Sequence, residues 1–294
     1  MSALVINEEF LSQVELLHML VKNNVAGLFG GNHQSKSFGS SCEFADYRDY
    51  IPGDDITKID WNVYARFEKL YLKLYLDERQ LHTRIYIDVS SSMAYGKGGK
   101  DKQAVRLAAA LAYLSICEMD KTSIYTICDG HVEAVIENML GKETYFNSIG
   151  KLNELSFDGD CAISQAILPS TVGYGDGMSI IISDFLTDND FEQAIDHLVS
   201  KKRDVLCIQV LSEEELHPQA RGKMHFFDSE NMQKYYRKNI NKDIIKAYQD
   251  ALNYVTGRIS NYCHSRGAEY MLVSAEDSLT DVFFGKLSSL GVLK

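Results

Sequence analysis

The sequence lacks several patterns that mark common classes of protein. Its six cysteines include no CxxC pair, so neither a zinc ribbon nor a disulfide scaffold is indicated. No apolar run reaches the roughly 18 residues that a membrane helix needs, and the N-terminus has neither the basic start nor the apolar core of a secretion signal. We therefore expect a cytoplasmic protein with no transmembrane segment.

The chain also lacks an excess of positive charge. It has 41 acidic against 30 basic side chains, which gives a net charge of -11. Such a charge opposes binding to a phosphate backbone or to an anionic membrane surface, so we expect no nucleic-acid partner. With 294 residues and 45% hydrophobic content, the chain can bury one large core, or one core with a smaller appendage.

The most informative stretch that is present is residues 84–93, RIYIDVSSSM, an apolar run that ends in one carboxylate and three hydroxyls. Its β-branched residues predict a buried strand, and the carboxyl edge of such strands is where ligands bind in an open α/β sheet. Asp88, Ser90 and Ser92 stand at alternate positions. A tight turn can therefore aim their oxygens at one point, as a hard cation such as Mg²⁺ requires.

A second strand of the same kind is predicted at residues 179–184, SIIISD, where three isoleucines precede a carboxylate. We expect Asp184 to face the same site as Asp88. A role as a helix cap is less favoured, because Asn189 and Glu192 already offer a start of the capping-box type to the next helix.

Apolar periodicity predicts the remaining elements. The predicted helices are residues 7–22, 100–118, 143–152, 189–201, 242–265 and 279–290, and the other predicted strands are 70–78, 123–128, 204–211, 223–227 and 270–274. This βαβα order indicates one α/β domain at residues 83–294, preceded by an accessory segment at 1–82. We expect strand 70–78 to pair antiparallel with strand 84–89, and the basic run 201–203 to be a solvated helix end.

Residues 42–66 are dense in acids and bases. Asp54, Asp55 and Asp60 permit two interpretations: an acid/base or metal cluster, or turn and cap residues that have Arg48 and Arg66 as counter-ions. The second interpretation is favoured, because the Gly-Asp-Asp sequence that contains the first two aspartates is typical of turns.

An ordered set of residues resembles domain-of-unknown-function family 58, whose members contain a von Willebrand factor A-like (vWA-like) domain. The residues that carry the resemblance are Gly31, His33, Ser35, Glu43, Phe44, Arg48, Asp49, Tyr50, Gly53, Asp54, Asp55, Ile59, Asp60, Trp61, Ala65, Arg66 and Asp88 to Met93. The chain departs from the family in having Ser41 where glycine is frequent, and in lacking the membrane helices that precede this region in many relatives.

The resemblance implies a Rossmann-like vWA fold, with a mostly parallel sheet flanked by helices and an N-terminal helix and β accessory segment. It also implies a metal-ion-dependent adhesion site and a partnership with AAA+ ATPases of the MoxR type. In such a site Asp184 is a ligand of the third loop, commonly through water. Cys161 stands where a threonine ligand is usual, and a soft thiol suits Mg²⁺ poorly. Asp158 or Asp160 could supply the missing oxygen.

Signatures of familiar hydrolases are missing. The chain has no GxSxG, and a phosphatase of the haloacid dehalogenase type would have an aspartate at the position of Ser90. The piece GGNHQSKS at residues 30–37 has Ser35 in place of the second glycine of a phosphate-binding loop, and no hydrophobic strand precedes it. A metal-dependent phosphoester hydrolase that uses Asp88 and Asp184 remains an alternative, since bound Mg²⁺ can activate water.

The favoured function is a non-enzymatic, metal-assisted protein-binding module. Asp88, Ser90, Ser92 and Asp184 are expected to hold Mg²⁺ or another divalent cation, which an acidic side chain of a partner completes. Neutral hydroxyl ligands leave the cation electrophilic enough to accept that outside carboxylate. The partner is expected to be a MoxR-type ATPase or its client protein. A further alternative is a vWA-like scaffold whose metal site is vestigial.

Overall fold

The computed structural model describes residues 5–24, 44–75, 81–94, 99–171, 177–186, 191–219, 222–227 and 235–287. Several residues on which the sequence analysis drew lie outside these ranges. They are the 30–37 loop with Gly31, His33 and Ser35, the departing Ser41, Glu43, and the expected cap residue Asn189.

The chain divides into two compact units. The larger combines Met1–Phe29 with Leu81–Lys294, and the smaller is Gly30–Gln80. The predicted division placed the first helix with the accessory segment, whereas the structure groups it with the larger unit.

The core of the larger unit is a six-stranded sheet. Its strands are β3 (His82–Asp88), β4 (Lys121–Cys128), β5 (His131–Met139), β6 (Met178–Ser183), β7 (Asp204–Leu211) and β10 (Glu269–Ser274), in the spatial order β10-β7-β6-β3-β4-β5. All neighbouring pairs are parallel except β4 and β5, which are antiparallel. The sheet is therefore doubly wound, with one antiparallel strand at its edge.

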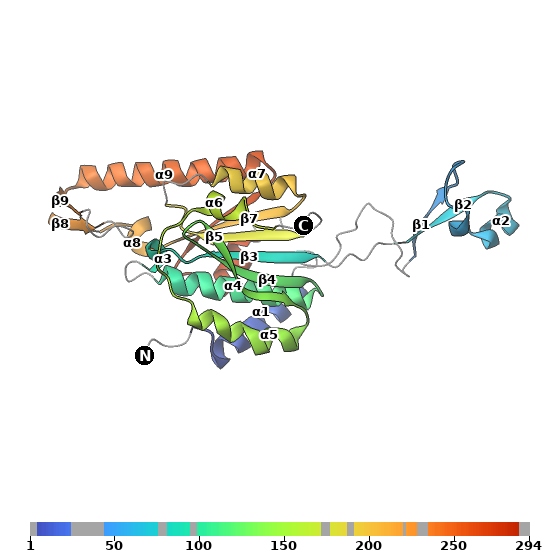
Figure 1. The fold of residues 1–294 in the computed structure, drawn as a ribbon, viewed down its shortest axis with the longest axis horizontal. Helices are drawn as coiled ribbons and strands as arrows, with labels where there is room; N and C mark the ends of the chain where they lie inside the picture. The colour runs from blue at the N-terminus through green and yellow to red at the C-terminus, as the bar shows by residue number, and fades with distance from the viewer. Residues whose placement is uncertain are drawn as a thin grey trace. The chain divides into compact units, whose positions relative to one another are not determined.

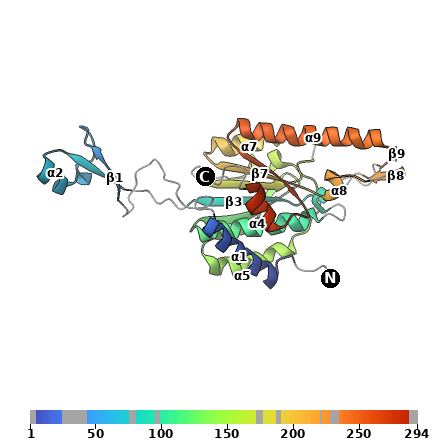
Figure 2. The same cartoon turned by 180° about the vertical axis from the view of Figure 1, so that it is seen from behind.

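Helices cover both faces of this sheet, as Figures 1 and 2 show from opposite sides. The helical segments are α1 (Glu8–Asn24), α3 (Ser91–Ala94), α4 (Lys100–Cys117), α5 (Lys142–Ser148), η2 (Ile149–Glu154), α6 (Ile163–Ile167), α7 (Glu192–Ser200), α8 (Glu213–Leu216), α9 (Lys242–Ser265) and η3 (Asp281–Leu287). The helices α1, α4 and α5 lie on one face, and α6, α7 and α9 lie on the other. A separate hairpin of β8 (Gly222–Phe227) and β9 (Tyr235–Ile240) precedes α9.

The central strands are buried on both faces because their apolar residues alternate between two cores. Ile85 and Ile87 of β3 join the core under α1 and α4, whereas Tyr86 joins the core under α6 and α7. In β6, Ile180 and Ile181 divide in the same way. Near-continuous apolar runs are what parallel strands covered on both faces require, so the sequence of these two strands places them at the centre of the sheet.

The described part of the smaller unit is built around an antiparallel pair of strands. The strands β1 (Phe44–Asp49) and β2 (Tyr71–Tyr75) flank the short helices η1 (Ile56–Lys58) and α2 (Trp61–Phe67). The expected pairing of strand 70–78 with strand 84–89 is therefore wrong: β2 pairs with β1, and β3 has parallel partners on both sides. The strand β1 was not predicted, because charged residues hide the alternation of its apolar residues.

The expectation of a solvated helix end at residues 201–203 is also wrong for its last residue. Arg203 is only 6% exposed. Its guanidinium donates to the backbone oxygens of His82 and Met178 and to Ser179 Oγ, so it links the starts of β3 and β6. Burial of a cation is tolerated here because the guanidinium donates several hydrogen bonds.

Candidate functional site

The end of β3 places a buried carboxylate at the carboxyl edge of the sheet. Asp88 is 0% exposed, and its Oδ1 accepts a hydrogen bond of 2.9 Å from the backbone N–H of Ser90. This local bond turns the chain sharply after the strand, as aspartate side chains commonly do. The turn leads directly into α3, so the serines that follow are held next to Asp88.

Two of these serines present hydroxyls to each other. Ser90 Oγ and Ser92 Oγ lie 3.1 Å apart, and Ser90 is fully buried. Ser91, between them, points elsewhere: its hydroxyl donates to Asp158 Oδ1 at 3.3 Å. The alternate positions thus place the hydroxyls of Ser90 and Ser92 side by side.

The end of β6 meets the end of β3. Ile87 is the register partner of Ile182, so the next residues, Asp88 and Ser183, are side by side. Ser183 Oγ donates to Asp88 Oδ2 at 2.5 Å. Burial raises the pKa of Asp88, and the nearby charge of Asp184 raises it further, against hydrogen bonds that lower it. The two carboxylates predicted from the sequence thus belong to one electrostatic site.

Cys161 lies in the same site, but its chemistry differs from that of a metal ligand. Its side chain is 1% exposed, and burial and the charge of Asp88 both raise the pKa of the thiol. The neutral thiol forms a hydrogen bond with Asp88. Neither neighbouring aspartate is seen to fill the gap: the Asp158 carboxylate accepts from Ser91 and Gly159, and the Asp160 side chain is exposed.

The site also contains a cation that was not predicted from the sequence. Lys100, the first residue of α4, is 1% exposed, and its Nζ lies 2.8 Å from Asp184 Oδ2 and 2.8 Å from Glu215 Oε1. Burial lowers the pKa of this lysine, but the attraction of the two carboxylates outweighs burial and leaves the pKa raised. The ammonium therefore stays charged. The sequence contains one indication of this pairing. A lysine in the first turn of a helix is unfavourable near the positive end of the helix dipole, so a nearby carboxylate is expected to pair with it.

Both carboxylates that hold Lys100 are themselves fixed. Asp184 Oδ1 accepts from the backbone N–H of Leu186 at 3.1 Å. Glu215 Oε2 accepts from the backbone N–H and the hydroxyl of Ser212, at 2.7 and 2.9 Å, in a capping box at the start of α8. The ammonium is thus clamped between the end of β6 and α8.

The donor set suits a hard divalent cation. Asp88, Ser90 and Ser92 offer oxygens, the ligand type that Mg²⁺ prefers. Among the described residues no cation forms an ion pair with Asp88, although the carboxylate is fully buried. The described part of the chain contains no group of three or more His, Cys, Asp or Glu side chains placed to hold a metal. Any cation held here would therefore depend on the serine hydroxyls.

The aspartates of the 42–66 segment have structural contacts. Asp60 is 5% exposed, caps α2 through the backbone N–H of Asn62, and accepts from Tyr47 Oη at 2.8 Å. Asp54 forms an ion pair of 2.8 Å with Arg48, one of the two counter-ions expected from the sequence. Asp55 accepts from the backbone N–H of Thr57 and caps η1. These contacts agree with the favoured interpretation as turn and cap residues.

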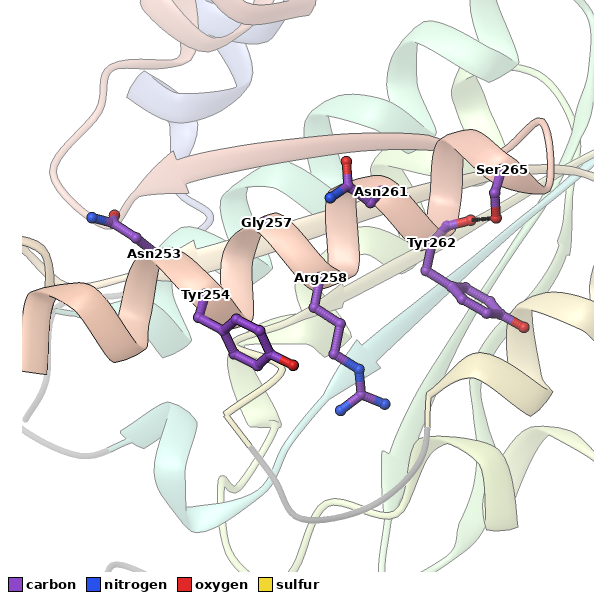
Figure 3. Close-up of a pocket in the computed structure, with 7 residues that line it drawn as sticks. All are labelled: Asn253, Tyr254, Gly257, Arg258, Asn261, Tyr262 and Ser265. Atoms are coloured by element: carbon purple, nitrogen blue, oxygen red, sulfur yellow. Dashed lines mark hydrogen bonds between the residues drawn. The ribbon is translucent and has the colours of Figure 1, made fainter.

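A pocket of about 610 Å³ lies along α9 and contains none of the predicted site residues. Figure 3 shows its lining, which comes from one side of that helix and includes Tyr254, Gly257, Arg258 and Tyr262. The Arg258 guanidinium is paired with Glu192 at 2.7 Å, so its charge is already balanced. We assign no function to this pocket.

Comparison with known proteins identifies the family. The sequence profile described as "Protein of unknown function DUF58" matches residues 46–254. The chain belongs to the DUF58 family. Uncharacterised proteins of Mycobacterium tuberculosis and Mycobacterium bovis are 27% identical to it over 202 residues, which cover 66% of this chain and 63% of theirs. The chain thus matches less than two thirds of the length of these curated relatives.

Solved structures of low sequence identity resemble the DUF58 chain in part. An aerotolerance-related membrane protein of Bacteroides fragilis is 15% identical and covers 72% of this chain and 98% of its own, with a TM-score of 0.40. The SpRpn10 VWA domain is 10% identical and covers 72% and 94%, with a TM-score of 0.38.

The topology of the sheet itself defines the fold class of this DUF58 protein. Five parallel strands, one antiparallel edge strand and helices on both faces confirm the predicted α/β, Rossmann-like vWA fold. Within the described ranges, no helix has the length and apolar character to cross a bilayer.

Proposed function

We propose that this DUF58 protein is a non-enzymatic binding module that recognises an acidic side chain of a partner protein at the carboxyl edge of its sheet. Mg²⁺ or another divalent cation would assist this recognition. The ligands we propose are Asp88, Ser90 and Ser92, with Asp184 acting directly or through water. A bound cation would supply a positive centre that attracts a carboxylate from outside.

One observation carries the proposal: the tips of β3 and β6 meet, with Ser183 Oγ 2.5 Å from Asp88 Oδ2. The contact brings Asp88 and the neighbouring Asp184 into one buried site beside the paired hydroxyls of Ser90 and Ser92. A buried carboxylate without an ion pair is costly. A divalent cation would offset that cost.

The proposed partner is a MoxR-type AAA+ ATPase or its client protein, as the family resemblance implies, and the proposed location is the cytoplasm. In this role the DUF58 chain would be an adaptor that binds the client, and the ATPase would supply the energy.

The enzymatic alternative would use a cation at the same site to activate a water molecule. Lys100 and the backbone N–H of Leu186 hold Asp184, while Ser183 and Ser90 hold Asp88. These donors fix the orientation of both carboxylates and leave lone pairs on their oxygens for a cation. This arrangement favours binding over proton transfer.

The proposal is tested by association of the full chain with the MoxR-type ATPase of the same genome, measured by surface plasmon resonance in Mg²⁺ and in excess EDTA. We expect Mg²⁺-dependent binding that Asp88→Ala abolishes. Ser91→Ala is the matched control and should bind normally, because Ser91 faces Asp158 rather than the site.

Two results would contradict this function. Equal association in Mg²⁺ and in EDTA would favour a scaffold with a vestigial metal site. Turnover of a phosphoester such as p-nitrophenyl phosphate by the wild type, lost in Asp88→Ala but retained in Ser91→Ala, would identify a hydrolase instead.

A further inference from the structure

The buried ammonium of Lys100 is a cation already built into the proposed site. Its Nζ lies 2.8 Å from Asp184 Oδ2, and Asp184 is one of the carboxylates that would serve the divalent cation. The lysine is 1% exposed, so solvent screens its charge poorly. A second cation entering the site must therefore share Asp184 with the ammonium and experience its repulsion.

The charges of the described cluster leave room for one divalent cation. Asp88, Asp184 and Glu215 are three carboxylates, and Lys100 is the one ammonium that touches two of them. Their net charge is two negative units when all are ionised. A single Mg²⁺ would neutralise that charge.

Glu215 is not one of the proposed ligands of the divalent cation, but it affects the charge balance of the site. Its Oε1 shares the ammonium with Asp184, while its Oε2 is fixed by Ser212. The ammonium is 2.8 Å from each of the two carboxylates, so only part of its charge is balanced by Asp184.

We propose that Lys100 is a positioning residue that limits the affinity of the site for divalent cations, and that Glu215 opposes this effect by sharing the ammonium with Asp184. The inference rests on the proposed function and concerns its regulation. A loosely held cation is one that the site can share with a partner carboxylate. Lys100 thereby favours exchange of the bound divalent cation over its permanent retention in the site.

The inference predicts affinity changes of opposite sign at two residues that touch each other. Removal of the positive charge by Lys100→Met or Lys100→Gln should tighten Mg²⁺ and Mn²⁺ binding by about tenfold or more, because the repulsion between the two cations is lost. Removal of the negative charge by Glu215→Gln should weaken binding. A purely structural role of the ion pair predicts weaker binding in all of these variants.

The experiment is isothermal titration of the full chain with MgCl₂ and with MnCl₂, paired with thermal unfolding in each salt and in EDTA. Lys100→Arg is the matched control, since it keeps the positive charge and should therefore not tighten binding as the neutral variants do. Lys100→Gln keeps a donor for Asp184 and serves where Lys100→Met does not fold. If neither neutral variant folds in EDTA, rescue of folding by Mg²⁺ supports the inference, and failure of rescue contradicts it.

The outcomes separate this inference from the proposed function. If the wild type binds a divalent cation and the neutral variants at Lys100 bind it no more tightly, the inference fails alone. If the wild type binds none and the neutral variants do, Lys100 blocks the site, and the metal-assisted function of the wild type fails. Absence of binding in every protein overturns both.

Discussion

At the scale of single residues, Cys161 is where the site departs most from an all-oxygen ligand set. A buried neutral thiol stands beside Asp88 where a hydroxyl would offer a hard oxygen. We predict that Cys161→Ser tightens Mg²⁺ binding by about threefold or more, measured by isothermal titration. Cys128→Ser is the control, because that thiol donates to the backbone oxygen of Asp158 instead. Equal affinity in the wild type and Cys161→Ser would show that position 161 is not adjacent to the ion.

His82, at the opposite edge of the sheet, gives a prediction for pH. Burial lowers the pKa of His82 to about 4, and the charges of Arg84, Arg203 and Lys121 contribute. The unfolded chain binds this proton near pH 6.5, so the free energy of unfolding should fall as pH decreases from about 6.5 to about 4.

The pH prediction is checked by urea unfolding at several pH values. His82→Gln should show a shallower loss of stability across that window than the wild type, because the amide does not titrate. His131→Gln, at an exposed position of β5, should keep the wild-type slope. A slope unchanged in His82→Gln would disprove the assignment.

Residue-level reasoning from sequence found the carboxylates and hydroxyls of the site but not its lysine. Asp88 and Asp184 were recognisable because each ends a β-branched run, and strand ends of this kind meet at one edge of a parallel sheet. Lys100 and Glu215 were not, because their contact joins positions 115 residues apart and no periodicity marks it. Only the structure shows that Lys100 and Glu215 are in contact.

At the scale of elements, the N-terminal edge of the sheet depends on close backbone approach. Gly177, just before β6, has a φ of +148°, and a Cβ there would lie 2.6 Å from the backbone oxygen of His82 and 2.8 Å from Arg203 Nη1. We predict that Gly177→Ala lowers the free energy of unfolding by about 1–3 kcal/mol, through overlap and strain.

Chemical denaturation of Gly177→Ala and Gly150→Ala measures this cost. A Cβ at Gly150 in η2 would meet no atom within 4 Å, so that variant should stay within about 0.5 kcal/mol of the wild type. Equal stability of Gly177→Ala and the wild type would mean that Arg203 does not hold the strand starts as described.

Elements with strong periodicity were predicted well, and elements without it were not. The predicted helix 242–265 and strand 204–211 match α9 and β7 residue for residue. The strands β1, β5 and β9 were missed. For β5 the cause is its burial pattern: as an edge strand, most of its side chains face solvent and include His131, Glu133 and Glu137, so its apolar alternation is weak.

At the scale of the whole molecule, the order of elements determined the fold class, but not the grouping of the chain ends. Alternating strands and helices allow few topologies when crossovers are right-handed and connections short. The position of α1 was not deducible, because an amphipathic helix can cover any apolar surface. Its residues Phe10, Val14 and Leu17 pack in the core that also contains α4, which makes the first helix part of the larger unit.

The carboxyl ends of β3 and β6 are proposed to hold one divalent cation through serine hydroxyls. The most direct test is Mn²⁺ binding, followed by electron paramagnetic resonance, in Ser90→Ala, Ser92→Ala and Ser91→Ala. The wild type and Ser91→Ala should bind one ion with equal affinity, and the other two variants should bind at least about tenfold more weakly because each loses an oxygen ligand. Equal binding in all four proteins, or binding in none, would contradict the claim.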